Sequence, residues 1–186
     1  MIKQVIEGKK CILLPFEPVD ALYFAEVYKD NEDKLVNGFI EGEFDVEVLA
    51  KEVQSKHDAG KLDIWIARTR QGSKARNIGF LVISDNMGYK ATLHGFVDKQ
   101  FLKDIAKQLD ERYTYTEDAL KTMIDWCFDY LKLQRLDVGI RAENKLSLKI
   151  CTKVGFKLEG TLRNYLKIGN GFHDLVALSI TPNDRG

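Results

Sequence analysis

The sequence predicts an α/β or α+β fold in which a mixed, mostly antiparallel sheet is flanked by helices. Three strand-like runs follow one another with only short turns between them, which indicates an antiparallel meander. Nearer the C-terminus a strand, a helix and a further strand succeed one another, which indicates a helix that crosses over the sheet. The 186 residues, 45% of them hydrophobic, are enough for one domain, residues 1–186, with a substantial core.

The first third of the chain predicts one strand and two helices. The apolar run 9–17 contains a proline near its end and suits a short strand. Asp20 can cap a helix over 20–30, whose apolar residues form a broad face. The segment 45–60 repeats apolar residues at helical spacing and ends on a glycine, a common helix stop.

The remaining segments predict the meander and the crossover unit. The meander comprises three predicted strands, 62–68, 78–84 and 91–97. A short extra helix is expected at 101–112, as an insertion near 99–111, ahead of the strongest helical pattern in the chain, 116–133. The last predicted elements are a strand at 135–141, a helix at 144–155 and two strands at 156–168 and 172–180.

Composition excludes several classes of function. Lysine and arginine total 28 against 28 acidic residues, so no overall field attracts nucleic acid or an anionic membrane. The N-terminus has no apolar signal segment, and no run approaches the roughly 20 apolar residues of a membrane span. The cysteines are widely spaced in apolar stretches without a CxxC pair, so we expect reduced thiols, no metal site and a cytoplasmic protein. These cysteines are Cys11, Cys127 and Cys151.

Residues 141–180 carry a pattern of ten positions in register. They are Asn144, Ser147, Lys153, Gly155, Phe156, Glu159, Gly160, Arg163, Gly171 and Asp174. This pattern resembles the C-terminal half of the GCN5-related N-acetyltransferase (GNAT) superfamily, in its ribosomal-protein N-terminal acetyltransferase (RimJ/RimL-like) branch. Residues 13–31 resemble the opening strand and helix of that family, and 118–140 its long central helix and next strand. The resemblance covers most of the chain.

The resemblance implies transfer of an acetyl group from acetyl-coenzyme A to a primary amine. In relatives the residues matching Asn144 and Ser147 lie beside the pantetheine arm of the cofactor. Ser147 is then the best-placed acid for the departing thiolate, with Cys151 one helical turn later as a second candidate. Without the resemblance, Asn144 reads as a helix N-cap and Ser147 as a solvated hydroxyl.

A general base is harder to assign from the sequence. Relatives often place a glutamate on the strand that here contains residues 93–96, and this chain has no acid there. His94, with an ordinary pKa of ~6.5, can accept a proton directly or through water, although a lone histidine on a strand is often structural. On the same strand, relatives supply an oxyanion-binding N–H from a bulge, which Gly95 permits beside Phe96. Glu159, Asp174 and ordered water remain alternatives as the base.

The turn before the long predicted helix departs from the family pattern. There, relatives carry glycines whose neighbouring N–H groups approach the pyrophosphate of coenzyme A at a helix N-terminus. Aligning the helix places Glu111 at the first position of that pattern, Arg112 next, Thr114 at the glycine and Thr116 at the small residue. Every position of the pattern is altered, so the sequence alone leaves the function of this turn open.

Three interpretations of this turn follow. It can be only a helix cap, in which Thr114 and Glu117 form a capping box and nothing binds. The inserted helix can instead remodel the site for another acyl donor or shield it. In the remaining interpretation polar groups replace the glycine cradle and hold the cofactor: Arg112, Thr114, Tyr115 and Thr116.

The acceptor site is expected between the first helices and the late hairpin, at 31–44 and 163–172. The first of these segments is acid-rich, which suits a cationic amine, and the candidates are a protein N-terminus, a polyamine or an aminoglycoside. The leading hypothesis is therefore an N-acetyltransferase, with a homodimer compatible with the sequence. The alternative is a non-catalytic GNAT-like domain with a degenerate cofactor loop, used for binding or assembly.

Overall fold

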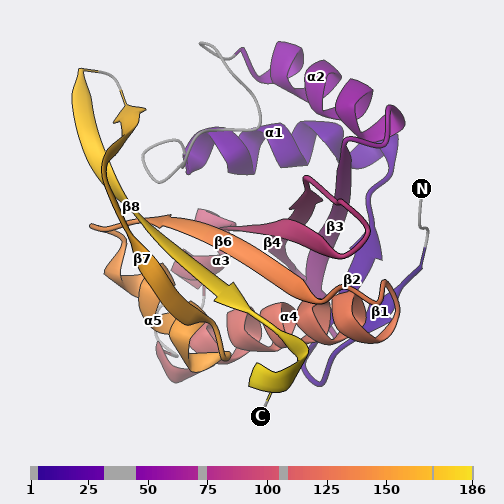
Figure 1. The fold of residues 1–186 in the computed structure, drawn as a ribbon. Helices are drawn as coiled ribbons and strands as arrows, with labels where there is room; N and C mark the ends of the chain where they lie inside the picture. Colours follow the sequence, from indigo (N-terminus) through magenta and orange to yellow (C-terminus); the bar gives the residue numbers. More distant parts are fainter. Residues whose placement is uncertain (1–3, 32–44, 71–74, 105–108, 169, 186) are drawn as a thin grey trace.

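Eight strands form one sheet in the computed structural model, which describes residues 4–31, 45–70, 75–104, 109–168 and 170–185 (Figure 1). The strand order is β1-β2-β3-β4-β5-β6-β8-β7, and every neighbouring pair is antiparallel except β5 and β6. The predicted mixed, mostly antiparallel sheet is therefore confirmed. The strands are β1 (Ile6–Glu7), β2 (Cys11–Pro15), β3 (Leu62–Thr69), β4 (Asn77–Ser84), β5 (Lys90–Val97), β6 (Arg135–Arg141), β7 (Lys157–Ile168) and β8 (Gly171–Ile180).

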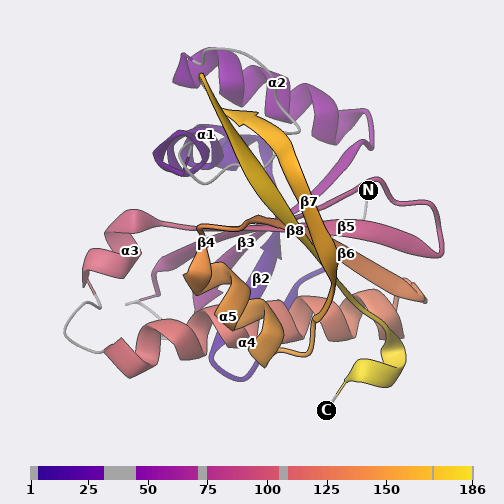
Figure 2. The same ribbon diagram turned by 60° about the vertical axis from the view of Figure 1, so that its left-hand side comes forward.

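Helices cover both faces of the sheet (Figures 1 and 2). One face packs against α1 (Ala21–Asp30) and α2 (Val46–Asp58), and the other against α4 (Leu109–Asp129) and α5 (Lys145–Lys153). The short α3 (Lys99–Asp104) directly follows β5. Accordingly, the sheet separates two clusters of buried apolar residues, one on each face.

The periodic patterns of the sequence predict where the helices pack. In α4, Ala119, Met123, Ile124 and Cys127 are all buried, because residues three and four apart share one face of a helix. The N-terminus of α2 is held by Asp45, whose Oδ1 accepts a hydrogen bond from the N–H of Glu47 at 2.8 Å. The buried face of each helix therefore packs against the sheet.

Asp20 differs from its expected role as the cap of α1. It ends a short 3₁₀ helix, Pro18–Asp20, and its Oδ2 accepts a hydrogen bond from the N–H of Glu17 at 2.9 Å. No side-chain bond from Asp20 caps α1. The carboxylate therefore closes the turn that leads into the helix, and it leaves the helix amides to other partners.

The meander and the crossover unit form as predicted. Two features of the sheet were not predicted: the short strand β1 and the position of the final hairpin in the strand order. The predicted strands 62–68, 78–84 and 91–97 correspond to β3, β4 and β5. The two-residue β1 is too short to give a periodic signal in the sequence. After the crossover through α5, the chain enters the edge strand β7 and returns as β8 between β7 and β6, so the final hairpin is inserted into the sheet order.

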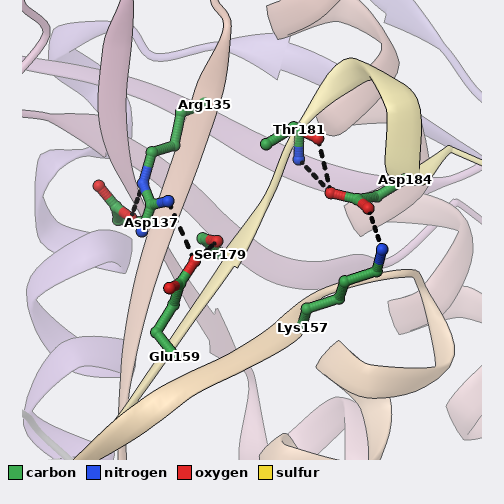
Figure 3. A network of polar contacts seen from close by, with 7 residues as sticks. All are labelled: Arg135, Asp137, Lys157, Glu159, Ser179, Thr181 and Asp184. Carbon is green, nitrogen blue, oxygen red and sulfur yellow. Dashed lines mark hydrogen bonds and ion pairs between the residues drawn. The ribbon is translucent and has the colours of Figure 1, made fainter.

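A polar network ties the three C-terminal strands together (Figure 3). The Arg135 guanidinium bonds Asp137 at 2.7 Å and Glu159 at 3.0 Å. Glu159 also accepts a hydrogen bond from the hydroxyl of Ser179 on β8. Glu159 therefore joins β6, β7 and β8, and it lies outside the pocket described below.

A second polar contact fixes α4 to the first hairpin. The Asp118 carboxylate accepts hydrogen bonds from the backbone N–H groups of Lys9, Lys10 and Cys11, at 3.2, 2.8 and 3.0 Å. The Lys10 ammonium donates to the Thr114 hydroxyl, one helical turn earlier, at 3.0 Å. Residues 114–118 are therefore held in register against β2 as part of a continuous helix.

The cysteines are free and buried, as expected. Burial raises the pKa of Cys11, and it raises the pKa of Cys127 and of Cys151 to about 12, so all three thiols stay protonated at neutral pH. Within the described residues, no group of histidine, cysteine and acidic side chains is arranged to hold a metal ion. The described helices also include none that is long and apolar enough to cross a membrane.

The core prediction concerns Met123, which is fully buried between α4 and the sheet. Met123→Ala should lower the free energy of unfolding by about 2–5 kcal/mol, because it leaves a cavity where side chains now pack. Chemical denaturation would measure the change. The exposed neighbour Lys121 is the matched control, and Lys121→Ala should stay within about 0.5 kcal/mol of the wild type. Equal effects of the two substitutions would contradict this packing.

Candidate functional site

The sheet opens between its two parallel strands. Among the described residues, β5 and β6 pair only from Lys90–Arg135 to Thr92–Asp137. Beyond Thr92, β5 continues beside β4 as far as Val97, while β6 continues beside β8. The two strands therefore diverge, and the gap between them has a free strand edge on each side.

A pocket of about 240 Å³ lies at this divergence. Its walls come from β4, β5 and β6, with α4 and α5 on one side of the sheet. It is lined largely by apolar side chains, with a few polar groups among them, as is usual for small-molecule sites. Eight of the residues singled out from the sequence line it: His94, Gly95, Phe96, Thr116, Asn144, Ser147, Cys151 and Phe156.

The free edge of β5 directs backbone groups into the pocket. The N–H of Asp98 donates to the carbonyl of Ile78 on β4 at 2.9 Å. Because backbone groups along a strand alternate between its two neighbours, those of Val97 and Gly95 point to the opposite side, where β6 has diverged. In agreement, the Asn31 side chain donates to the carbonyl of Val97 at 3.1 Å. The N–H of Gly95 is therefore a hydrogen-bond donor that faces the pocket.

The bulge expected at Gly95 is wrong. β4 and β5 pair without a register shift from Gly79–Val97 to Ser84–Thr92. The two strands come very close here, since a Cβ on Gly79 would lie 1.9 Å from the carbonyl oxygen of Phe96. A free N–H arises instead because β6 diverges, and no extra residue in β5 is needed.

The N-terminus of α5 borders the pocket and contributes two polar residues. The side-chain oxygen of Asn144 accepts a hydrogen bond from the N–H of Ser147 at 3.2 Å, so Asn144 caps the helix as expected. Both residues are half-buried and line the pocket. After the other end of α5, Gly155 has a φ of +112°, which glycine adopts easily, and the side chain of Phe156 lies in the core.

His94 is the histidine that lines the pocket. It lies on β5 and is half-buried, and its Nε2 is 2.9 Å from the Ser84 hydroxyl oxygen on β4. Burial lowers its pKa from 6.5 to about 4, and the nearby Asp85 carboxylate opposes this shift. The imidazole is therefore neutral at physiological pH.

Asp174, the other acidic residue considered as a base, has a different contact. Its Oδ1 accepts a hydrogen bond from the N–H of Asn164 at 2.8 Å, across the β7–β8 hairpin. Asn164 has a φ of +51°, which asparagine adopts more readily than most residues. Asp174 therefore stabilises an irregular part of the hairpin.

The segment read as a turn is helical. The predicted helix start at 116 is wrong, because α4 begins at Leu109 and runs through the threonines. The predicted capping box at Thr114 is also wrong: Thr114 binds Lys10, and Glu117 pairs with Lys153 at 2.7 Å. Threonine followed three residues later by glutamate resembles a helix cap in the sequence. Here both residues lie within α4, and their side chains bind Lys10 and Lys153 instead of the backbone of a helix N-terminus.

The structure divides the residues proposed for the altered loop. Thr116 lines the pocket, whereas Thr114 and Tyr115 do not. The Tyr115 ring lies 5.7 Å from the Lys10 ammonium and packs edge-on against Phe101. The side chain of Arg112 lies outside the described part of the chain, as do residues 105–108 of the predicted helix 101–112. The first residues of that predicted helix belong to α3, and its last residues, 109–112, begin α4.

Two further residues of the site are Asn31, the first residue of the predicted acceptor segment 31–44, and Gly139, which was not predicted. Asn31 lines the pocket from the end of α1 and bonds the backbone of β5. Gly139 on β6 also lines it, and its only signal in the sequence was a glycine inside an apolar strand, which marks a close approach of ligand or backbone. The contact of Asn31 with β5 was not predicted, because it joins residues 66 positions apart.

Comparison with known proteins places this site in a family. A family model described as an acetyltransferase (GNAT) domain matches residues 10–157. "Probable N-acetyltransferase YjcK" of Bacillus subtilis (strain 168) is 34% identical over 68 residues, which span 36% of this chain and 38% of that protein. The chain therefore belongs to the GNAT acetyltransferase family.

Solved structures agree on the fold. A GNAT-family acetyltransferase from Bacillus anthracis superimposes with a TM-score of 0.73 at 18% identity, covering 96% of this chain and 98% of that one. RimL, a ribosomal L7/L12 alpha-N-protein acetyltransferase solved in complex with coenzyme A, superimposes with a TM-score of 0.72 at 14% identity, with the same coverage. At these identities the likeness establishes the fold alone.

The lowered pKa of His94 predicts a pH dependence of stability. The unfolded chain binds a proton at His94 near pH 6.5, whereas the folded protein binds it only near pH 4. The free energy of unfolding should therefore fall as the pH drops through this window, by on the order of 2–3 kcal/mol from this group. In His94→Asn this part of the fall should be missing.

Denaturation at pH 7 and at pH 4.5 measures the effect in both proteins. The difference between the two pH values should be larger for the wild type than for His94→Asn. An identical difference would show that His94 is not buried in its neutral form.

Proposed function

We propose that this chain is an N-acetyltransferase that moves an acetyl group from acetyl-coenzyme A to a primary amine. The observation that carries the proposal is the pocket between β5 and β6, which gathers eight residues singled out from the sequence in a chain of the GNAT family. Acetyl-coenzyme A supplies an activated acetyl thioester. The residues of the chain bind and orient it and handle the protons.

The pocket suits a slender arm with both apolar and amide groups. Its free strand edge offers the N–H of Gly95, and its far wall offers the side chains of Asn144 and Ser147. Backbone N–H groups and short polar side chains are the usual partners of amide carbonyls. We therefore assign Gly95, Asn144, Ser147 and Thr116 to holding the pantetheine arm, with Phe96 beside it. Polar groups at Arg112, Thr114 and Tyr115 remain proposals for the distal phosphates.

The same groups can perform the proton chemistry. An N–H aimed at the carbonyl oxygen of the acetyl group stabilises negative charge that develops there, and Gly95 supplies such a donor. Ser147, at the start of α5, is placed to donate a proton to the departing sulfur. Neutral His94 accepts a proton from the amine nitrogen.

The acceptor is proposed to enter from the side that α1 and α2 cover. The β7–β8 hairpin extends to this side of the sheet, next to α1 (Figure 1). At its base, His173 is 3.2 Å from Glu143, which places an exposed carboxylate beside the start of α5. A cationic amine, such as a protein N-terminus or a small amine, fits this charge. RimL, with the same fold, acts on the N-terminus of a ribosomal protein.

The remaining acid-rich residues of the predicted acceptor segment, 32–44, lie outside the described part of the chain. A cytoplasmic location is proposed from the three cysteines, which are free and buried. Assembly as a homodimer is likewise a proposal from the sequence. None of these three points is needed for the chemistry assigned to the pocket.

Titration calorimetry with acetyl-coenzyme A tests the proposal directly. We expect saturable binding of one ligand per chain. No heat at hundreds of micromolar ligand would contradict the enzyme and favour a non-catalytic domain that uses the fold for binding or assembly. Desalted protein and a buffer-matched ligand provide the baseline.

The role of Ser147 is tested by turnover. Ser147→Ala should lower kcat by roughly 10- to 100-fold, because one proton donor is lost while the fold is kept. Release of free thiol from acetyl-coenzyme A reports the rate. Lys149→Ala, an exposed change on the same helix, is the control and should leave the rate unchanged. A Ser147→Ala rate equal to that of the control would remove Ser147 from the mechanism.

A further inference from the structure

Hydrogen bonds link three polar side chains in a row, from the pocket to the surface. His94 lines the pocket, and its Nε2 lies 2.9 Å from the hydroxyl oxygen of Ser84. That hydroxyl donates to Oδ2 of Asp85 at 3.0 Å. Ser84 is 6% exposed, whereas Asp85 is exposed at the start of the β4–β5 turn. This row of hydrogen bonds therefore links the pocket to a carboxylate in solvent.

The direction of these hydrogen bonds follows from the groups themselves. An ionised carboxylate can only accept, so the Ser84 hydroxyl proton points to Asp85. The Ser84 oxygen then accepts from His94, so the proton of the neutral imidazole is on Nε2. In this tautomer Nδ1 carries the lone pair and is the nitrogen that takes up a proton.

We propose that Ser84 and Asp85 are positioning residues that hold His94 as the Nε2–H tautomer, so that its Nδ1 acts as the general base of the reaction. This inference rests on the proposed function for its chemistry. As the bond between the amine nitrogen and the acetyl carbon forms, the C–S bond of the thioester breaks. The sulfur leaves with the electron pair of that C–S bond and takes a proton from Ser147, which regains one from water. In the same reaction an N–H bond of the amine breaks and an N–H bond forms at Nδ1. The electron pair of the broken bond stays on the amine nitrogen. Water then takes the proton from Nδ1 and restores neutral His94.

The location of Asp85 supports this assignment. Its charge opposes the effect of burial on His94, so it favours the imidazolium that forms transiently. On the neighbouring strand β6, Asp137 is held by Arg135 at 2.7 Å and Arg141 lies near Glu143, 3.6 Å away. Asp85 is thus the carboxylate joined to His94 through a hydroxyl.

The backbone at Asp85 also limits which residues fit. Its φ of +50° is in the left-handed region, where aspartate and asparagine are tolerated better than most side chains. Asp85→Asn therefore keeps the backbone and removes the charge. It also provides an amide N–H that can donate to the Ser84 oxygen. The Ser84 hydroxyl would then donate to Nε2 of His94, and the imidazole proton would move to Nδ1.

The tautomer can be measured without any turnover. The chain has three histidines, so long-range ¹H–¹⁵N spectra of the ring nitrogens are readily assigned. At pH 7 we expect the Nε2–H tautomer of His94 in the wild type, and a shift toward Nδ1–H in Asp85→Asn. An Nδ1–H tautomer in the wild type, or an unchanged tautomer in Asp85→Asn, would overturn the inference even if the enzyme is active.

Kinetics test whether the two residues act through His94. We expect His94→Ala to lower kcat about 100-fold and Asp85→Asn about 10-fold, with KM for acetyl-coenzyme A unchanged in both. The double variant should be no slower than His94→Ala alone, because Asp85 has nothing to position once the imidazole is gone. Multiplied losses in the double variant would show that Asp85 acts independently.

Ser84→Ala and a charge control complete the test. Ser84→Ala should lower kcat as Asp85→Asn does, and Ser84→Thr, which keeps the hydroxyl, should restore it. Asp58→Asn removes one exposed carboxylate on α2 and should leave both tautomer and rate unchanged. If the wild type binds no acetyl-coenzyme A, the proposed function fails, while the tautomer spectra still decide the positioning role.

Discussion

The divergence of β5 from β6 after Thr92 is the constraint on which the rest of the site depends. Strand edges carry N–H and C=O groups that need partners, and an unpaired edge inside a protein is costly. Here that edge borders a pocket, so its backbone groups are available to a ligand. The N–H of Gly95 is placed by strand pairing alone, and it needs neither a bulge nor a special side chain.

The two strands are held apart by what each of them pairs with. β5 stays with β4 up to Val97, helped by the close approach at Gly79, and β6 stays with β8 up to Arg141. The polar network around Arg135 and Glu159 fixes β6 to the final hairpin, while the buried stripe of α4 packs across the sheet. The pocket is therefore a consequence of strong pairing on both sides of a short parallel contact.

Local patterns predicted most of this fold, since strands and helices follow from periodicity and from residues such as Gly60 and Asn144. Asn144 and Ser147 were predicted as site residues from the resemblance to the GNAT family, and both line the pocket. The errors have a common cause in tertiary contacts. Thr114 resembles a cap, but Lys10, 104 positions away, holds it in a helix, and the bulge at Gly95 is replaced by a divergence of strands that no local pattern encodes. From the sequence, Ser84 is only the end of the predicted strand 78–84 and Asp85 only the start of the turn after it, because their partner His94 is on the next strand.

The central claim is that the gap between β5 and β6 holds the pantetheine arm of coenzyme A. Backbone ¹H–¹⁵N spectra recorded during titration with coenzyme A test it residue by residue. The account predicts that the largest changes fall on the amides of Gly95, Val97 and Ser147, with the amide of Gly95 shifting as expected for a new hydrogen bond. Changes confined to other parts of the chain, with Gly95 and Ser147 unaffected at saturation, would contradict it.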